Sequence, residues 1–104
     1  MRITLRVVGG FTGRAGAEVY EVDVDRLPHD EASRLQRLVA AAGFFSLAPD
    51  VRKPAPASWD FLHELTIADG NKIHTVRFHL DAVPTALRTL CDEIIAQAQR
   101  GRPD

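Results

Sequence analysis

The chain has 104 residues, of which 45% are hydrophobic and 26% charged, and its formal net charge is −1. This length suits one domain that can bury a core without metals or disulfides, and the composition is that of an ordinary globular protein. The net charge is near zero, and the sequence contains no block of basic or acidic residues. The charge distribution therefore gives no indication of a nucleic-acid partner.

Residues 2–8 alternate between apolar and polar side chains, which predicts a strand with one face in the core. Residues 17–25 alternate in the same way, so two antiparallel strands joined by residues 9–16 are the simplest solution. That connection holds four glycines and Phe11 within eight residues. It is longer than a tight hairpin requires, and its length needs an explanation.

A helix is predicted after Pro28, because proline suits the first turn of a helix and apolar residues then recur at helical spacing. Gly43 is placed for a left-handed cap at its end. The apolar residues Phe44, Phe45 and Leu47 follow, and we interpret them as a plug that seats the helix on the sheet. Residues 48–58 contain three prolines, which exclude a regular helix or a central strand and predict an extended, exposed segment.

Residues 59–68 and 72–80 again alternate and predict two strands. The sequence Asp69-Gly70-Asn71 between them is a strong hairpin signal. In the second of these strands, Arg77 and His79 are expected to face solvent. Pro84 opens a final helix, and residues 100–104 are expected to fray.

The predicted order is therefore β-β-α-β-β-α within a single domain of residues 1–99. Each strand alternates instead of being apolar throughout. We therefore expect an α+β fold in which a four-stranded antiparallel sheet has one face in water and two helices packed on the other.

The side chains needed for an active site do not converge in this sequence. The histidines lack the spacing of a zinc motif, and no serine lies in a nucleophile elbow. Cys91 is the one cysteine; it lies on the apolar stripe of a predicted helix, so we interpret it as a small buried hydrophobe. His63, on the apolar side of its strand, is expected to be part-buried and hydrogen-bonded. We therefore expect no enzyme, no bound metal and no cofactor.

The N-terminal residues lack the apolar region of a secretion signal, and no apolar run approaches the ~18 residues of a membrane span. These features predict a cytoplasmic protein without a membrane partner.

Two interpretations of Phe11 are open on composition and spacing alone. Its side chain either folds back to cap the core or is offered to a pocket on another molecule, with the glycines allowing close approach.

Several stretches, in this order and spacing, resemble the emfourin family, whose members are proteinaceous inhibitors of thermolysin-like (M4) metalloproteases. No one stretch is highly specific, but together they cover nearly the whole chain. They are the opening Met1-Arg2-Ile3, the Gly9-Gly10-Phe11-Thr12-Gly13 run, Asp25-x-Leu27-Pro28, the Glu31 to Val39 helix, Phe44-Phe45-x-Leu47, the Pro-rich loop, Asp69-Gly70 and Val83-Pro84.

The resemblance implies a stoichiometric inhibitor of a thermolysin-like (M4) zinc metalloprotease. The sequence shows no strong dimer surface, so we expect a monomer. The resemblance also implies that the glycine-rich loop 9–16 and the Pro-rich loop 48–59 block the substrate cleft, with Phe11 entering or covering the apolar specificity pocket. Trp59 and Arg14 would be further anchors. For Trp59 a place at the edge of the core stays open, and for Arg14 a solvated side chain. The expected partner-binding residues are Gly9, Gly10, Phe11, Thr12, Gly13, Arg14, Pro54, Pro56 and Trp59.

The alternative function is a non-catalytic interaction module or adaptor that uses the exposed face of the sheet. Val8, Val19 and Leu62 offer apolar side chains there, although charged neighbours dilute them.

Overall fold

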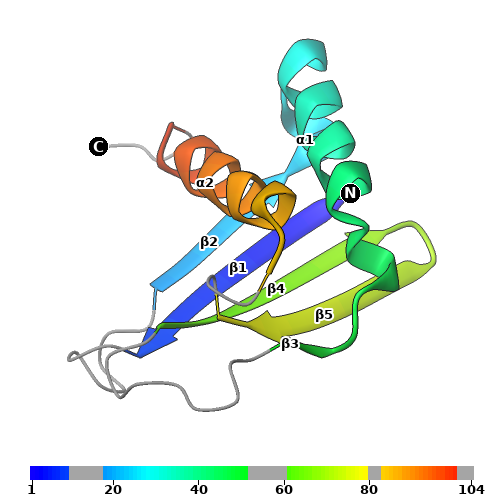
Figure 1. Ribbon diagram of the computed structural model, residues 1–104. Helices are drawn as coiled ribbons and strands as arrows, with labels where there is room; N and C mark the ends of the chain where they lie inside the picture. The colour runs from blue at the N-terminus through cyan, green and yellow to red at the C-terminus, as the bar shows by residue number, and fades with distance from the viewer. Residues whose placement is uncertain (10–17, 52–60, 80–82, 101–104) are drawn as a thin grey trace.

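The computed structural model describes residues 1–9, 18–51, 61–79 and 83–100. Within these ranges the chain forms five strands and two helices, arranged as Figure 1 shows. The strands are β1 (Arg2–Gly9), β2 (Glu18–Asp23), β3 (Asp50–Val51), β4 (Phe61–Asp69) and β5 (Lys72–Phe78). The helices are α1 (His29–Ala42) and α2 (Thr85–Arg100), and two short 3-10 turns are η2 (Val24–Arg26) and η3 (Phe44–Ser46).

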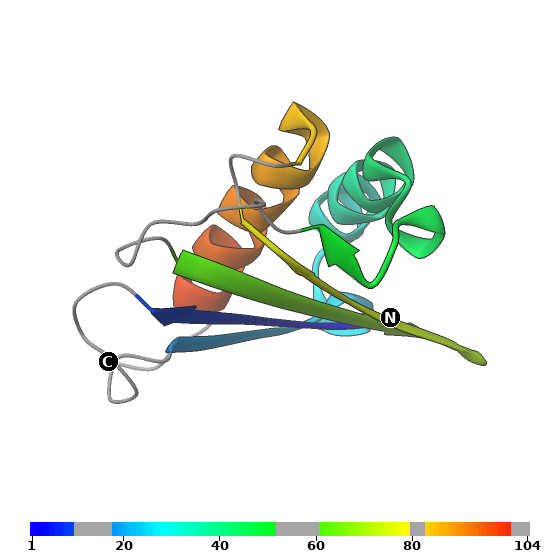
Figure 2. The same cartoon turned by 60° about the horizontal axis from the view of Figure 1, so that its bottom comes forward.

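The strands form one mixed sheet in the order β2-β1-β4-β5-β3. β1 pairs antiparallel with β2 and β4, and β4 pairs antiparallel with β5, whereas β3 pairs parallel with β5. Both helices lie on one face of this sheet, as the two views in Figures 1 and 2 show. The two-layer α+β arrangement predicted from the sequence is therefore confirmed.

The prediction of a four-stranded, wholly antiparallel sheet is wrong in one strand. β3 lies inside the proline-rich stretch that we expected outside the sheet. The backbone amide of Arg77 donates to the carbonyl oxygen of Pro49 at 2.8 Å. The amide of His79 donates to the carbonyl oxygen of Val51 at 3.4 Å. Proline lacks a donor but keeps its acceptor, so it can precede a short strand at the edge of a sheet.

The alternating pattern of the strands places the core between sheet and helices. In β1, Ile3 and Leu5 are fully buried, while Arg2 and Arg6 are exposed. The buried apolar residues of the described ranges form one cluster to which both helices and both halves of the chain contribute. Burial on one side of each strand is what allows the other face to carry charge.

Helix α1 begins and ends as its sequence predicts. Pro28 immediately precedes the first helical residue, and Gly43 takes the left-handed conformation at φ 60° and ends the helix. The next residue, Phe44, is buried, and its ring meets the imidazole of His74 edge-on at 5.4 Å between centroids. Nε2 of His74 donates to the carbonyl oxygen of Leu47 at 2.8 Å. These contacts seat the end of α1 on β5, as predicted.

Helix α2 packs against α1 through an apolar stripe and a polar bridge. Glu93 of α2 lies 3.6 Å from the guanidinium of Arg34 in α1 and 3.6 Å from that of Arg100. Gln97 also donates to Glu93, at 3.2 Å. α2 includes Arg100, so the helix continues one residue past the boundary that the sequence predicted, and residues 101–104 lie outside the described ranges. Neither helix is long and apolar enough to cross a bilayer, within the parts of the chain that are described.

The β4–β5 hairpin closes at one end of the sheet. Asp69 pairs with Lys72, which leaves Gly70 and Asn71 as a two-residue loop. Gly70 has φ +61°, so the first central position is the one that needs glycine, as in a type II′ turn. The predicted hairpin is therefore confirmed.

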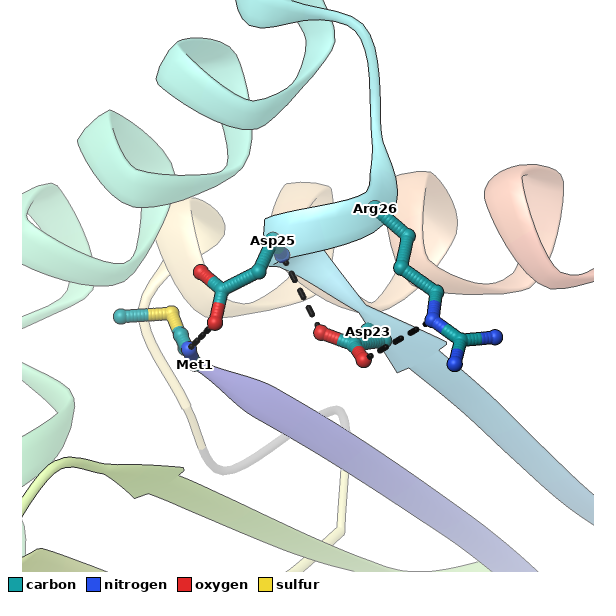
Figure 3. A network of polar contacts seen from close by, with 4 residues as sticks. All are labelled: Met1, Asp23, Asp25 and Arg26. Atoms are coloured by element: carbon teal, nitrogen blue, oxygen red, sulfur yellow. Dashed lines mark hydrogen bonds and ion pairs between the residues drawn. The ribbon is translucent and has the colours of Figure 1, made fainter.

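Polar contacts fasten the same end of the sheet, where β1 begins and β2 finishes (Figure 3). The amino group of Met1 lies 3.2 Å from a carboxylate oxygen of Asp25. Asp23 accepts a hydrogen bond from the amide of Asp25 at 3.1 Å, and its other oxygen lies 3.6 Å from Nε of Arg26. This end is thus closed by a hairpin and a polar network, and the chain leaves the sheet for its long connections at the opposite end.

Candidate functional site

The residues predicted to bind a partner fall mostly outside the described ranges. Among them, only Gly9 has a described backbone, as the last residue of β1. Gly10, Phe11, Thr12, Gly13, Arg14, Pro54, Pro56 and Trp59 lie outside the described ranges. The geometry of the candidate site is therefore built from the strand ends that flank residues 10–17 and 52–60.

The first pair of strand ends belongs to β1 and β2. β1 finishes at Gly9, and β2 begins at Glu18, which is opposite Val7 in the antiparallel register. Residues 10–17 therefore join two neighbouring strands at one end of the sheet. This position agrees with the long connection predicted between two strands.

The second pair of strand ends lies at the same end of the sheet. Phe61, the first residue of β4, is the direct partner of Gly9. Val51, the last residue of β3, is the partner of Phe78, which in turn is the partner of His63 in β4. Residues 10–17 and 52–60 therefore leave and re-enter the sheet at one end, which Figure 1 shows at the tip of β1 and the starts of β2 and β4.

Two buried histidines, His63 and His79, lie at this end of the sheet. His63 is 7% exposed and its ring stacks on Phe78, with centroids 5.5 Å apart and planes at 19°. Burial of His63 agrees with its predicted place on the apolar side of the strand. His79 is also 7% exposed, so the prediction that it faces solvent is wrong. It follows the last residue of β5, where the strand alternation no longer determines which side a residue occupies.

The uncovered face of the sheet is more polar than the interaction-module alternative requires. Val8 pairs with Leu62 and both are half-buried, while Val19 is 45% exposed and lies opposite Arg6. Charged Arg6 and Glu64 therefore interrupt the apolar side chains that this alternative would use, as the sequence indicated.

The surroundings of Cys91 suppress the reactivity of its thiol. Cys91 is buried, and burial, with a smaller contribution from Asp92, raises the pKa of its thiol to about 12, so the thiol stays protonated at neutral pH. In residues 1–9, 18–51, 61–79 and 83–100, no three His, Cys, Asp or Glu side chains are grouped to hold a metal ion. The buried, hydrophobic role predicted for Cys91 is confirmed.

The model of the family described as Emfourin matches residues 5–95 of the chain. The chain belongs to the emfourin family. The match runs from β1 into α2 and therefore includes both long connections. Emfourin membership suggests a protease-inhibitor role with a protease as partner, and it implies a protein that is not an enzyme. Neither the curated proteins nor the solved structures include a significant match to this emfourin.

One part of the site went unnoticed in the sequence. Asp50, Glu64 and Arg77 come from three strands and meet on the uncovered face, close to the end from which the long connections leave. The alternation of β4 and β5 predicts the outward direction of Glu64 and Arg77. Glu64 and Arg77 lie close together because of the register between β4 and β5, and Asp50 lies close to Arg77 because β3 pairs with β5.

Proposed function

We propose that this emfourin is a stoichiometric inhibitor of a thermolysin-like (M4) zinc metalloprotease, and that residues 9–16 and 48–59 together obstruct the substrate cleft of the protease. The observation that supports this proposal most is the pairing of Gly9 with Phe61. It places the point where residues 10–17 leave β1 next to the point where residues 52–60 re-enter the sheet at β4. Two segments that each have one end at this pair of residues can contact one partner at the same time.

The composition of the first segment supports a role for Phe11. Thermolysin-like proteases, to which the family resemblance points, favour cleavage on the N-terminal side of a bulky apolar residue, and Gly10-Phe11 offers such a bond or a mimic of one. Glycines without Cβ let a backbone approach a surface closely. In this proposal Phe11 fills or covers the apolar specificity pocket, and Thr12, Gly13 and Arg14 contact its rim.

The second segment contributes a stiffer contact. Pro54 and Pro56 restrict the backbone, so ordering this segment on a partner costs less conformational entropy than ordering a glycine-rich one. Trp59 is the large aromatic residue of this segment, and Trp and Arg are the commonest anchors of protein interfaces. A stiff contact from residues 48–59 would offset the ordering cost of the glycine-rich segment.

The rest of the fold supports inhibition by a rigid platform. β1 and β4, the strands next to the candidate site, lie inside the sheet with a partner on each side. Ile3, Leu5, Leu65 and Ile67 of these strands are fully buried. A platform held in this way does not have to reorganise on binding, which favours affinity.

An inhibition titration tests the proposal. A thermolysin-like enzyme, held well above the expected dissociation constant, is mixed with increasing amounts of this protein and the residual activity is measured. The proposal predicts a linear fall to an equivalence point near one to one, with a serine protease unaffected under the same conditions. Full residual activity at a severalfold excess would refute it, and recovery of another partner by pull-down would then favour the interaction-module function.

A further inference from the structure

A row of alternating charges crosses the uncovered face of the sheet near the candidate site. In the strand register, Arg6 of β1 is opposite Glu64 of β4, and Glu64 is opposite Arg77 of β5. Arg77 is in turn opposite Asp50 of β3. The order across the four strands is therefore positive, negative, positive, negative. Facing charges of opposite sign on neighbouring strands attract one another.

Arg77 is the centre of this row, because it contacts the strands on both sides of β5. Its side-chain Nε donates to a carboxylate oxygen of Glu64 at 2.9 Å. Its backbone amide donates to the carbonyl oxygen of Pro49 at 2.8 Å. The pKa of Arg77 is raised above its usual value, chiefly because Glu64 accepts its hydrogen bond and attracts its charge, with a smaller attraction from Asp50. The side chain of Arg77 thus contacts β4 and attracts Asp50 of β3, while its backbone amide bonds the residue just before β3.

These two strands are the ones that residues 52–60 connect. The chain leaves β3 after Val51 and re-enters the sheet at Phe61 of β4, while β5 lies between the two strands. We propose that Arg77 is a positioning residue of the inhibitory surface, because its guanidinium, bonded to Glu64 of β4, lies opposite Asp50 of β3 and attracts it, and so helps to fix where the chain leaves the sheet before residues 52–60. The inference rests on the proposed function, in which residues 48–59 contact the protease.

The ion pair of Arg77 is expected to affect the edge strand β3 and not the stability of the whole fold. Its side chain is 53% exposed and that of Glu64 is 29% exposed, and ion pairs of this kind add little to global stability. β3 has only two residues at the edge of the sheet, so it can open without unfolding of the core. Loss of the Arg77 side chain removes its attraction to Asp50 and keeps the backbone hydrogen bond to Pro49, so β3 should loosen slightly while the melting temperature stays the same.

Hydrogen exchange tests this fastening without any protease. In Arg77→Gln and in Glu64→Gln, the backbone amides of residues 77 and 79, which donate to Pro49 and Val51, should exchange about two- to fivefold faster than in the wild type. Amides between β1 and β4 should be unchanged. Arg2→Gln is the matched control, because Arg2 is an exposed arginine on the same face, opposite Asp23 at the other end of the sheet. It should leave exchange at residues 77 and 79 unaltered.

Inhibition measurements test the consequence. Both variants should raise the inhibition constant for a thermolysin-like enzyme about two- to fivefold at an unchanged melting temperature. The double variant Arg77→Gln with Glu64→Gln should be no weaker than either single variant, because both remove the same contact.

The possible outcomes separate this inference from the proposed function. Wild-type exchange rates at residues 77 and 79 in both variants would overturn the fastening, and faster exchange with an unchanged inhibition constant would overturn the positioning role. If the wild-type protein inhibits no thermolysin-like enzyme, the proposed function fails and the positioning role fails with it. The exchange rates still decide the fastening of β3 in that case.

Discussion

Gly9 and Phe61 are direct partners in the antiparallel pairing of β1 and β4. Gly9 is the last described residue before residues 10–17, and Phe61 is the first after residues 52–60. One connection therefore leaves the sheet directly beside the point where the other, far away in the sequence, re-enters it. The proposed inhibitory surface depends on this pairing, and the predictions below test the surface and the scaffold that carries it.

Replacing Phe11 with alanine should weaken inhibition of a thermolysin-like protease more than tenfold. A phenylalanine that enters a partner's pocket contributes about 1.5–3 kcal/mol through burial of its apolar surface. The melting temperature should not change if Phe11 serves the partner and not the core. Inhibition assays and thermal unfolding of the same preparation measure both effects.

The matched control for Phe11→Ala is Ile73→Ala. Ile73 is 72% exposed on β5, close to the hairpin at the opposite end of the sheet, so its truncation should alter neither inhibition nor melting. A lower melting temperature with full inhibition in Phe11→Ala would show instead that Phe11 caps the core.

Replacing Gly70 with alanine should destabilise the fold by about 1–2 kcal/mol without affecting inhibition. Gly70 has φ +61°, a conformation that costs L-residues about this much. A Cβ at this position would meet no atom within 4 Å, so the cost would come from the backbone and not from a clash. Gly70→Asn should lose less, because Asn tolerates positive φ. Urea unfolding measures both variants, and an alanine variant as stable as the wild type would contradict this account of the turn.

Stability should fall with pH in the alkaline range because of Cys91. Its pKa rises from 9.0 to about 12 on burial, so above about pH 9 the unfolded chain loses a proton that the folded chain keeps. The stabilisation is fully present below pH 9 and is lost as the pH rises towards 12, by up to about 1.4 kcal/mol per pH unit.

Comparison with Cys91→Ala isolates this effect, because every other titrating group is common to the two proteins. The difference in unfolding free energy between wild type and variant should shrink as the pH rises from about 8.5 to about 10.5. Parallel pH profiles would contradict a buried, protonated thiol.

The elements that the sequence predicted well are those encoded by local patterns. The alternation in β1 predicts which of its residues are buried, and Gly43 and Gly70 adopt positive φ where the helix and the hairpin turn. Pro28 precedes α1 as expected. Each of these signals depends on a residue and its near neighbours, so it can be read without knowledge of the tertiary structure.

β3 could not be predicted in the same way, because two residues are too few to show an alternating pattern. Asp50 and Val51 become a strand only through the edge of β5, where the amides of Arg77 and His79 donate to the carbonyl oxygens of Pro49 and Val51. The prolines around them argued against a strand, although a proline carbonyl is a good acceptor.

The sequence predicted some features of the candidate site and missed others. The position of residues 9–16 between two strands followed from periodicity, whereas the protease partner followed from the family resemblance. The neighbourhood of Gly9 and Phe61, and the contacts of Arg77 with Glu64 and Pro49, depend on which strands pair and in which register. Those pairings are long-range properties of the fold and leave no local signal in the sequence.

Hydrogen exchange of this emfourin, alone and in an equimolar mixture with a thermolysin-like protease, tests the central claim most directly. We predict that the protease protects the end of the sheet at Gly9, Glu18, Val51 and Phe61, together with the segments between them, and leaves the hairpin at Gly70 unchanged. Protection confined to that hairpin or to the uncovered face of the sheet, with none at the end where Gly9 meets Phe61, would contradict the account.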